Sequence, residues 1–190
     1  MASAPRAQPD GRLANVSAAL VLPMGCCEHE GTRIGRQGAT STLLRRLFED
    51  VVIVADAGAA EPGPAGDVTL APPTRWLERD AASQSPLADL ALALEAAREE
   101  RQLVLAADSG FVTAELLLGL TAWPEHECVA PRIDGAVQPF CALYQREAAL
   151  RALYAELARD EPSLSSFLNQ LDCGVLEGDD LACLLPAKLS

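Results

Sequence analysis

Apolar runs and amphipathic stretches alternate along the first two thirds of the chain. Residues 17–23, 51–55 and 103–107 are short apolar runs without a charge, which is typical of strands buried on both faces. Residues 40–48 and 87–100 instead repeat leucine or alanine at helical spacing, so each predicts an amphipathic helix. Strands that alternate with helices in this way predict a mostly parallel sheet with helices on both faces, a three-layer, Rossmann-like α/β sandwich.

Shorter elements are expected around and beyond these. Ser85 is a candidate cap for the helix at 87–100, with Pro86 in its first turn. Thr113 is expected to cap the next helix, whose leucines at 116, 117 and 120 turn inward. Further strands are expected at residues 68–70, 128–130, 140–144 and 175–176, a hairpin turn at 133–136, and helices at 146–159 and 163–171.

The length fits one domain. With 190 residues, the chain can bury a core without disulfides or metals. We expect residues 1–16 to form a flexible N-terminal tail, since the start of the chain lacks the apolar stretch of a secretory signal. Residues 17–190 are then a single domain. No run of about 18 apolar residues is free of charge, so no membrane-spanning helix is expected.

A surplus of acidic residues limits the class of partner. The chain has 15 Lys and Arg against 27 Asp and Glu, a net charge of −12. This surface repels phosphate polymers at long range, which argues against binding of DNA or RNA. A single mononucleotide remains compatible with this charge, because local backbone amides can hold it.

The cysteines form no C-x-x-C pair. Without an export signal, we expect them to be reduced thiols in a cytoplasmic protein. Cys26 and Cys27 stand beside Glu28 and His29, which are all zinc-ligand types, but adjacent cysteines chelate one tetrahedral ion poorly. A structural metal is therefore not predicted. The six cysteines are Cys26, Cys27, Cys128, Cys141, Cys173 and Cys183.

A polar, glycine-rich segment at residues 24–38 follows the first predicted strand. Its glycines allow close backbone approach to a phosphate, and Arg33 or Arg36 can pair with the phosphate charge. The segment is neither G-x-G-x-x-G nor a Walker A motif. It is interpreted either as a phosphate loop or as a flexible surface loop.

Asp108 follows the third apolar run directly. A carboxylate at the mouth of a parallel sheet can hold a divalent cation that carries substrate phosphates. The alternative is a turn residue, because Asp is common in turns. Ligands of such sheets sit beyond the carboxyl ends of the strands, where both Asp108 and the 24–38 segment are expected.

Several segments, taken in order, resemble the MobA-like nucleotidyltransferases, a family that includes molybdenum cofactor guanylyltransferases. Residues 103–117, with Asp108, are similar to the family's strand–Asp–x–Pro–aromatic segment and following helix. Residues 85–89 (SPLAD) resemble its Gly-Pro-Leu-Ala-Gly, residues 131–144 its DG…QP…ALY segment, and residues 162–168 its late helix. The resemblance covers roughly residues 17–177 and implies a fold of the nucleotide-diphospho-sugar transferase type.

The resemblance implies roles for particular residues. Asp108 matches the family's magnesium ligand. Arg33 and Arg36 would pair with the triphosphate, and all three residues would be catalytic. Asp134, Gln138 and Pro139 fall where the acceptor substrate is approached. The cofactors implied are Mg²⁺ and GTP or CTP, the acceptor is molybdopterin-like, and proteins that handle the cofactor or molybdoenzymes are possible partners. The implied nucleotide-binding positions are Pro23, Met24, Gly25, Gly35, Asp80, Ser85, Pro86 and Leu87.

The sequence also departs from the family pattern. Gly38 stands where the family has a phosphate-binding lysine, and loss of one such donor costs about 10²–10³ in rate. Arg36 can supply a charge in its place, with a different geometry. Asp89 replaces a glycine and is expected to add negative charge near the nucleotide. Gly110 replaces a proline, and the C-terminal Asn-x-Asn-Thr-Pro that helps hold the metal has no match.

Two interpretations follow. In the first, the protein is an enzyme that transfers a nucleoside monophosphate from GTP or CTP to molybdopterin phosphate and releases pyrophosphate. In the second, it is a catalytically degenerate relative that binds a nucleotide or cofactor as an accessory protein. Asp108 and residues 134–139 favour the enzyme, whereas the missing lysine, the missing asparagines and Asp89 favour the accessory protein.

Overall fold

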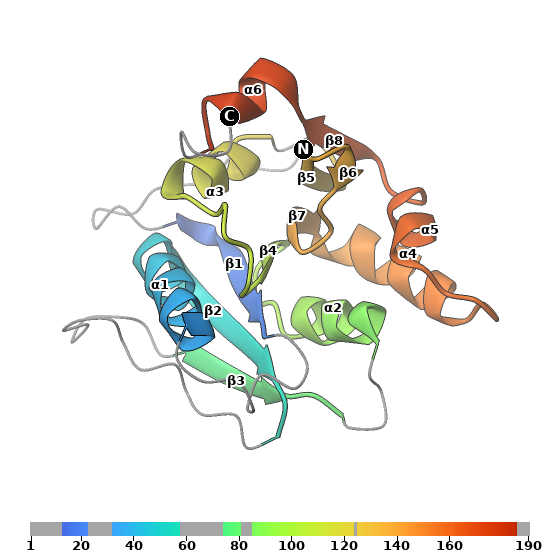
Figure 1. The fold of residues 1–190 in the computed structure, drawn as a ribbon. Helices are drawn as coiled ribbons and strands as arrows, with labels where there is room; N and C mark the ends of the chain where they lie inside the picture. Colours follow the sequence, from blue (N-terminus) through green and yellow to red (C-terminus); the bar gives the residue numbers. More distant parts are fainter. Residues whose placement is uncertain (1–12, 23–31, 58–73, 81–84, 124, 186–190) are drawn as a thin grey trace.

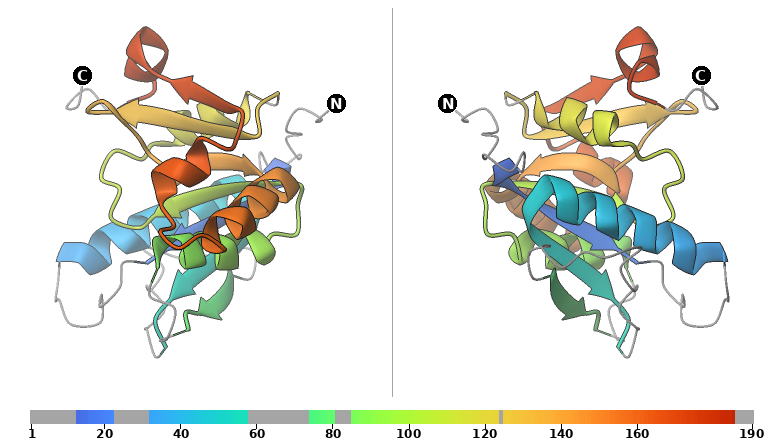
Figure 2. Two further views of the ribbon diagram at one scale, coloured as in Figure 1. Left: turned by 90° about the vertical axis from the view of Figure 1, so that its right-hand side faces the viewer. Right: turned by 90° about the vertical axis from the view of Figure 1, so that its left-hand side faces the viewer.

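A computed structural model shows a mixed sheet between two layers of helices (Figures 1 and 2). It describes residues 13–22, 32–57, 74–80, 85–123 and 125–185. In chain order, the elements are β1 (Leu13–Val21), α1 (Thr32–Leu47), β2 (Phe48–Ala55), β3 (Thr74–Glu78), α2 (Pro86–Glu95), β4 (Arg101–Ala106), α3 (Ala114–Thr121), β5 (Cys128–Ile133), β6 (Ala136–Val137), β7 (Cys141–Gln145), α4 (Arg146–Leu157), α5 (Leu164–Leu168), β8 (Cys173–Leu176) and α6 (Gly178–Ala182).

The strands are ordered β3-β2-β1-β4-β7-β5, and both β6 and β8 pair with β5. Strands β3, β2, β1 and β4 are mutually parallel, and β8 is parallel to β5. Only β7 runs antiparallel to its two neighbours in the main sheet, β4 and β5. The chain reaches β7 through a short hairpin, which is too short for the crossover that a parallel strand requires. The predicted sandwich with a mostly parallel sheet is thus confirmed.

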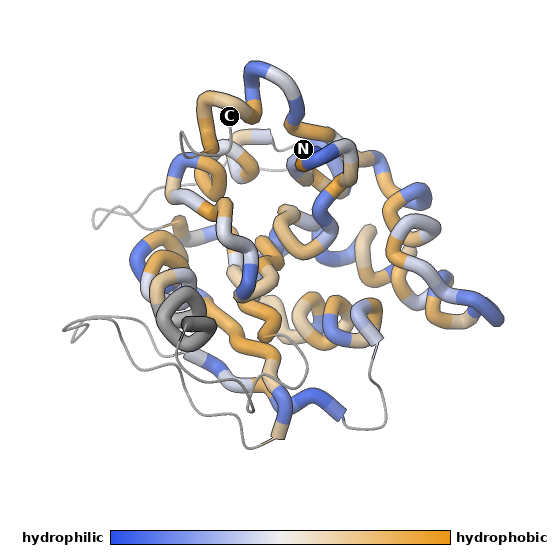
Figure 3. Tube along the Cα trace, viewed as in Figure 1, coloured by the Kyte–Doolittle hydropathy of each residue, from blue (hydrophilic) through white to orange (hydrophobic). Residues whose placement is uncertain are grey.

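Alternate residues of the central strands build two cores, one on each face of the sheet. Leu20 of β1 and Leu105 of β4 pack on the side of α1, α3 and α6. Val21 and Val104, their neighbours in sequence, pack on the side of α2, α4 and α5. Figure 3 shows the hydrophobic colour concentrated on the central strands. This double burial explains why the strands read as unbroken apolar runs.

Some element bounds differ from the sequence expectations. Leu13 and Val16 are buried in the core, so β1 begins within the stretch expected to be tail. Helix α1 begins at Thr32, inside the segment expected to be a loop, because a helical glycine costs only about 1 kcal/mol and tertiary packing overrides such a propensity. Strand β3 was not predicted, and the strand expected at 68–70 lies outside the described residues.

The two predicted helix caps have different outcomes. The Thr113 hydroxyl accepts a hydrogen bond from the Leu116 N–H (3.1 Å), as predicted, and also donates to the Leu184 carbonyl (2.8 Å). Ser85 occupies the cap position of α2 but its side chain makes no capping hydrogen bond, so that prediction is wrong in its chemistry. Within the described residues, no helix is both long enough and apolar enough to cross a membrane.

A buried carboxylate joins α4 to α5. Glu156 is fully buried, and its carboxylate accepts hydrogen bonds from the Ser163 N–H and the Ser166 hydroxyl, each 2.8 Å long. It also accepts one from the side-chain amide of Gln170 (2.8 Å). The bond from the Ser163 backbone is the largest cause that lowers the pKa of Glu156 below its ordinary value of 4.5, and it acts against burial.

We expect acid to destabilise the protein through Glu156. Because the pKa of this carboxyl is lower in the folded chain than in the unfolded chain, its contribution to stability is complete above the ordinary value of 4.5. The contribution is lost as the pH falls through the folded-state pKa. In urea unfolding from about pH 7 to about pH 3, the stability gap between wild type and Glu156→Gln should therefore narrow. Exposed Glu161, replaced by Gln, is the control, and a gap that stays constant with pH would contradict the role of Glu156.

Candidate functional site

The carboxyl ends of β1 and β4 meet in the middle of the sheet, where the chain connections change direction. From β1 the chain continues through α1 to β2 on one side, whereas β4 lies on the other side of β1 (Figure 1). The Leu22 N–H donates to the Val54 carbonyl (2.9 Å), and the Ala107 N–H donates to the Val21 carbonyl (3.0 Å). Open α/β sheets bind their ligands at this switch point. The end of β1 and the turn that follows β4 therefore mark the candidate site.

A buried arginine ties together the elements along this edge. Arg79 directly follows β3 and is 6% exposed. Its guanidinium donates to both carboxylate oxygens of Asp89 in the first turn of α2 (2.6 and 2.9 Å). It also donates to the Leu22 carbonyl after β1 (2.7 Å) and to the Asp56 carboxylate after β2. Arg79 thus fixes the ends of β1, β2 and β3 to the start of α2.

The same pairing changes the setting expected of Asp89. This carboxylate is 5% exposed and paired with Arg79, so it does not face a nucleotide as a free charge. Arg79 is shared with Asp56, so one negative charge of the three side chains remains. Burial alone would lower the pKa of Arg79, but the hydrogen bonds to Asp89 and Asp56 outweigh it and raise that pKa. Arg79 is therefore a permanent cation, and it offsets in part the carboxylate that departs from the family pattern.

Asp108 lies on a turn directly after β4. The Ser109 N–H closes the turn by donating to the Ala106 carbonyl (3.2 Å), and the Asp108 side chain is exposed. Because Ala107 pairs with Val21, the carboxylate borders the point where the chain leaves β1. Proteins usually hold Mg²⁺ through one or two carboxylates plus substrate phosphates. One exposed carboxylate at the mouth of the sheet fits a cation that arrives with a nucleotide.

The segment predicted to approach the acceptor lies beside the end of β4. The Ala106 N–H donates to the Phe140 carbonyl (2.7 Å), which places Gln138 and Pro139 next to the Asp108 turn. The Pro139 carbonyl accepts a hydrogen bond from the hydroxyl of buried Tyr144 (2.7 Å). The Gln138 backbone N–H donates to the Pro131 carbonyl (3.0 Å). These bonds hold the segment in place.

Asp134 lies at the tip of the β5–β6 hairpin. It is exposed and has a φ of 50°, and Gly135 follows with a φ of 79°. Two successive left-handed residues form the tight turn of a two-residue hairpin, and Asp tolerates this conformation better than most side chains. The predicted hairpin turn is thus confirmed, and part of the reason for Asp134 is conformational.

The predicted nucleotide-binding residues are only partly described. Pro23, Met24 and Gly25 lie outside the described residues. The first two turns of α1 contain Arg33, Gly35 and Arg36. Helix α1 runs antiparallel to β1, so it begins at the candidate edge (Figure 2).

The remaining predicted positions flank the start of α2. Asp80 and Pro86 are exposed and Ser85 is half-buried. Leu87, in contrast, packs in the core against the sheet, so its side chain does not face the site. Only its backbone can contribute to ligand binding.

Two residues of this edge were missed in the sequence. Asp56 follows an apolar run just as Asp108 does, so the same pattern could have identified it. Arg79 had no such signal, because the five residues of β3 are half-buried or exposed and do not read as a strand. Its partners Leu22, Asp56 and Asp89 come from three other segments, and only the tertiary structure assembles them.

Residues 37–174 match the MobA-like NTP transferase domain. The chain belongs to this family. The part of this MobA-like chain that matches includes Asp80, Asp108 and residues 134–139, but it begins after Arg33 and Arg36. Over 98 residues the chain is 32% identical to a Bacillus licheniformis protein named "Probable molybdenum cofactor guanylyltransferase". The alignment spans 50% of this chain and 50% of that protein, so only about half of the relative's length is matched.

Solved structures share the fold. A protein of Aquifex aeolicus VF5 has a TM-score of 0.69 at 15% identity and matches 89% of this chain and 90% of its own. The 4-diphosphocytidyl-2C-methyl-D-erythritol synthase of Anaerococcus prevotii has a TM-score of 0.61 at 12% identity, over 86% and 89% of the two chains. Molybdopterin-guanine dinucleotide biosynthesis protein A of Archaeoglobus fulgidus has a TM-score of 0.56 at 18% identity, over 87% and 86%. The predicted fold type is thus confirmed.

Proposed function

We propose that this MobA-like protein transfers a nucleoside monophosphate from GTP or CTP to a phosphate of molybdopterin and releases pyrophosphate. The observation that carries the proposal is the exposed carboxylate of Asp108 at the switch point, with Gln138 and Pro139 beside it. The relative from Bacillus licheniformis supports GTP and molybdopterin as substrates. Because the synthase from Anaerococcus prevotii shares the fold, CTP and a sugar phosphate remain the alternative pair of substrates.

In the proposed reaction, an oxygen of the acceptor phosphate attacks the α-phosphorus of the nucleotide. The new P–O bond forms in line with the bond to the β-phosphate oxygen, which breaks and leaves with pyrophosphate. Asp108 would hold Mg²⁺, which when bound neutralises charge on the phosphates. Catalysis then depends on positioning and charge, and no proton needs to move between side chains.

The chain's own residues have distinct positions in this proposal. Arg33 and Arg36 belong to the first turns of α1 and would pair with the triphosphate, since helix N-termini favour phosphates. Pro23, Met24, Gly25 and Gly35 would provide close backbone approach to it. Asp80 after β3, and Ser85, Pro86 and the Leu87 backbone at the start of α2, would border the nucleoside. Asp134, Gln138 and Pro139 would line the acceptor side, with Gln138 and Pro139 beside the Asp108 turn.

The pairing of Asp89 with Arg79 strengthens the enzyme interpretation. Three departures favoured a non-catalytic accessory protein: the missing lysine, the missing asparagines and the added carboxylate of Asp89. The carboxylate is buried and paired with Arg79, so it does not face a nucleotide as a free charge. Arg79 also pairs with Asp56, so the three side chains together keep one negative charge. A turnover experiment decides between the two interpretations.

The experiment combines binding with turnover. GTP, CTP and ATP are titrated calorimetrically into the protein with MgCl₂, and pyrophosphate release is then measured with molybdopterin or 2-C-methyl-D-erythritol 4-phosphate as acceptor. We expect magnesium-dependent binding of one nucleotide and pyrophosphate release only when molybdopterin is present. Binding without release from any pair would support the accessory protein. The absence of binding at millimolar nucleotide would overturn both interpretations.

A further inference from the structure

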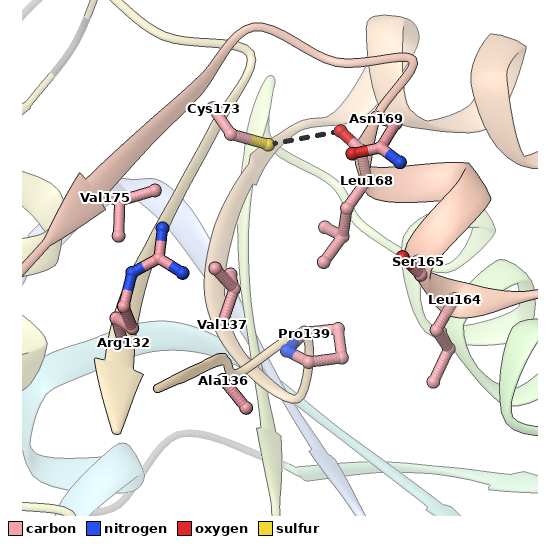
Figure 4. A pocket seen from close by; sticks show the side chains of 10 residues that line it. All are labelled: Arg132, Ala136, Val137, Pro139, Leu164, Ser165, Leu168, Asn169, Cys173 and Val175. Atoms are coloured by element: carbon pink, nitrogen blue, oxygen red, sulfur yellow. Dashed lines mark hydrogen bonds between the residues drawn. The ribbon is translucent and has the colours of Figure 1, made fainter. Parts of the chain in front are cut away.

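A cavity lies between α5 and the far edge of the sheet, and one end of it reaches Pro139 of the segment predicted to approach the acceptor. Its volume is about 540 Å³, within the range of about 300–1,000 Å³ typical of small-molecule sites. Val137 and Pro139 form one wall and Leu164 and Leu168 of α5 form the other (Figure 4). The half-buried thiol of Cys173, at the start of β8, also lines this cavity.

A second thiol lies directly beside Cys173. Cys128 of β5 is its in-register partner on the neighbouring parallel strand. Neighbouring strands lie about 4.7–4.9 Å apart, and disulfides join Cα atoms that are about 4.4–6.8 Å apart. As register partners, the two side chains project from the same face of the sheet and belong to the same core. Both cysteines are free thiols, so the pair has the spacing of a disulfide without being one.

The two thiols differ in exposure and in acidity. The neighbouring side chain of buried Cys128 lowers the pKa of Cys173, against burial and the nearby carboxylates of Asp172 and Glu127. The same contact and its own burial raise the pKa of Cys128 strongly. The Cys173 thiol also donates to the Leu168 carbonyl (3.5 Å). The accessible sulfur of Cys173 is thus the better nucleophile, and the buried sulfur of Cys128 is a second, less reactive thiol beside it.

We infer that Cys173 is a thiol-modification site that reacts with low-molecular-weight disulfides entering the α5 cavity, and that Cys128 is its resolving thiol. The Cys173 thiolate attacks one sulfur of a disulfide R–S–S–R, which forms Cys173–S–S–R and releases R–S⁻. Cys128 then loses its proton to the released thiolate and attacks the Cys173 sulfur. This step releases the second R–S⁻ and leaves a Cys128–Cys173 disulfide. In total, one small disulfide is reduced to two thiols and the two cysteines are oxidised.

The second step is slower than the first. Capping Cys173 removes the neighbouring thiolate charge, which is one cause of the raised pKa of Cys128. The burial of Cys128 remains, so only a small fraction of this thiol ionises at neutral pH. The mixed disulfide on Cys173 therefore accumulates before the internal disulfide forms.

The test uses the reduced, full-length protein and 5,5′-dithiobis(2-nitrobenzoate) under native conditions. Samples are quenched with acid at intervals, and each cysteine is followed by peptide mass spectrometry. We expect a transient adduct on Cys173, followed by a Cys128–Cys173 linkage whose mass is two hydrogens lower than that of the dithiol. Cys128→Ser keeps a hydroxyl donor beside Cys173 and should trap the adduct. Exposed Cys183, at the C-terminal end of α6, is the internal reference for accessible thiols.

Each outcome decides one part of the proposal. If Cys173 stays unmodified while Cys183 reacts completely, the cavity does not admit small disulfides and the proposal is wrong. If wild type forms a permanent adduct on Cys173, Cys128 is not a resolving thiol. The same reaction in urea should scatter the linkages among several cysteines, which shows that the native fold selects the pair. None of these measurements depends on nucleotide transfer, so they stand apart from the proposed function.

Discussion

Asp108→Asn is expected to lower kcat/KM for pyrophosphate release by about 10²–10³-fold, because asparagine keeps the shape of the turn residue but removes the charge that holds a cation. The side chain is exposed and the turn is closed by the backbone of Ser109 and Ala106, so the fold should be unaffected. Circular dichroism and urea unfolding check this. Calorimetry should show that the magnesium-dependent part of nucleotide binding is also reduced.

Asp160→Asn is the matched control, because Asp160 is an exposed aspartate in the connection after α4 and the candidate site includes no residue of that connection. It should leave turnover unchanged. If Asp108→Asn and Asp160→Asn have the same kcat/KM, Asp108 holds no catalytic cation and serves only as a turn residue. Full rescue of Asp108→Asn by excess MgCl₂ would restrict its role to metal affinity.

Arg79→Leu is expected to lower the free energy of unfolding by about 3–5 kcal/mol, because it leaves the buried carboxylate of Asp89 without its partner. It also removes the hydrogen bonds to the Leu22 carbonyl and to Asp56. Urea unfolding followed by circular dichroism measures the loss. A loss of this size is a large part of the stability of a typical domain, so low temperature is the better condition for the variant.

The double variant Arg79→Leu/Asp89→Leu separates the ion pair from the packing. Replacing both members of a buried pair with apolar side chains is often neutral or stabilising, so most of the lost stability should return. The exposed pair Arg151–Glu127 (3.5 Å) is the control, and Arg151→Leu should cost less than about 1 kcal/mol. Equal losses for Arg79→Leu and Arg151→Leu would mean that Asp89 remains solvated.

The parts of the fold that the sequence predicted well are those in which one local pattern suffices. The apolar runs that became β1, β2 and β4 are buried on both faces, so nearly every residue in them is apolar. The exception is buried Ser17, whose hydroxyl donates a hydrogen bond to Asp50 (2.7 Å). The leucines of α3 repeat at helical spacing and all three predicted ones are buried. Asp108 could be identified because a charge that ends such a run lies at the sheet edge.

The misses arose where a local pattern is weak or has two explanations. Strand β3 is at the edge of the sheet, half-buried and only five residues long, and its alternation is too short to recognise. The glycines of residues 31–38 were read as a loop, although α1 includes residues from Thr32 onward. Glycine permits a loop without requiring one, and the packing of the rest of α1 on the sheet determined the conformation.

The sequence by itself determined the α/β sandwich, the position of Asp108 beyond a central strand and the membership of residues 131–144 in one hairpin-linked segment. Only the tertiary structure decided which charges are neutralised and which thiols are neighbours. Asp89 is ten residues from Arg79, and Cys173 is 45 residues from Cys128, and neither spacing has a local signature. Ion pairs and thiol pairs depend on distances of a few ångströms, and strand order and register, not sequence separation, set those distances.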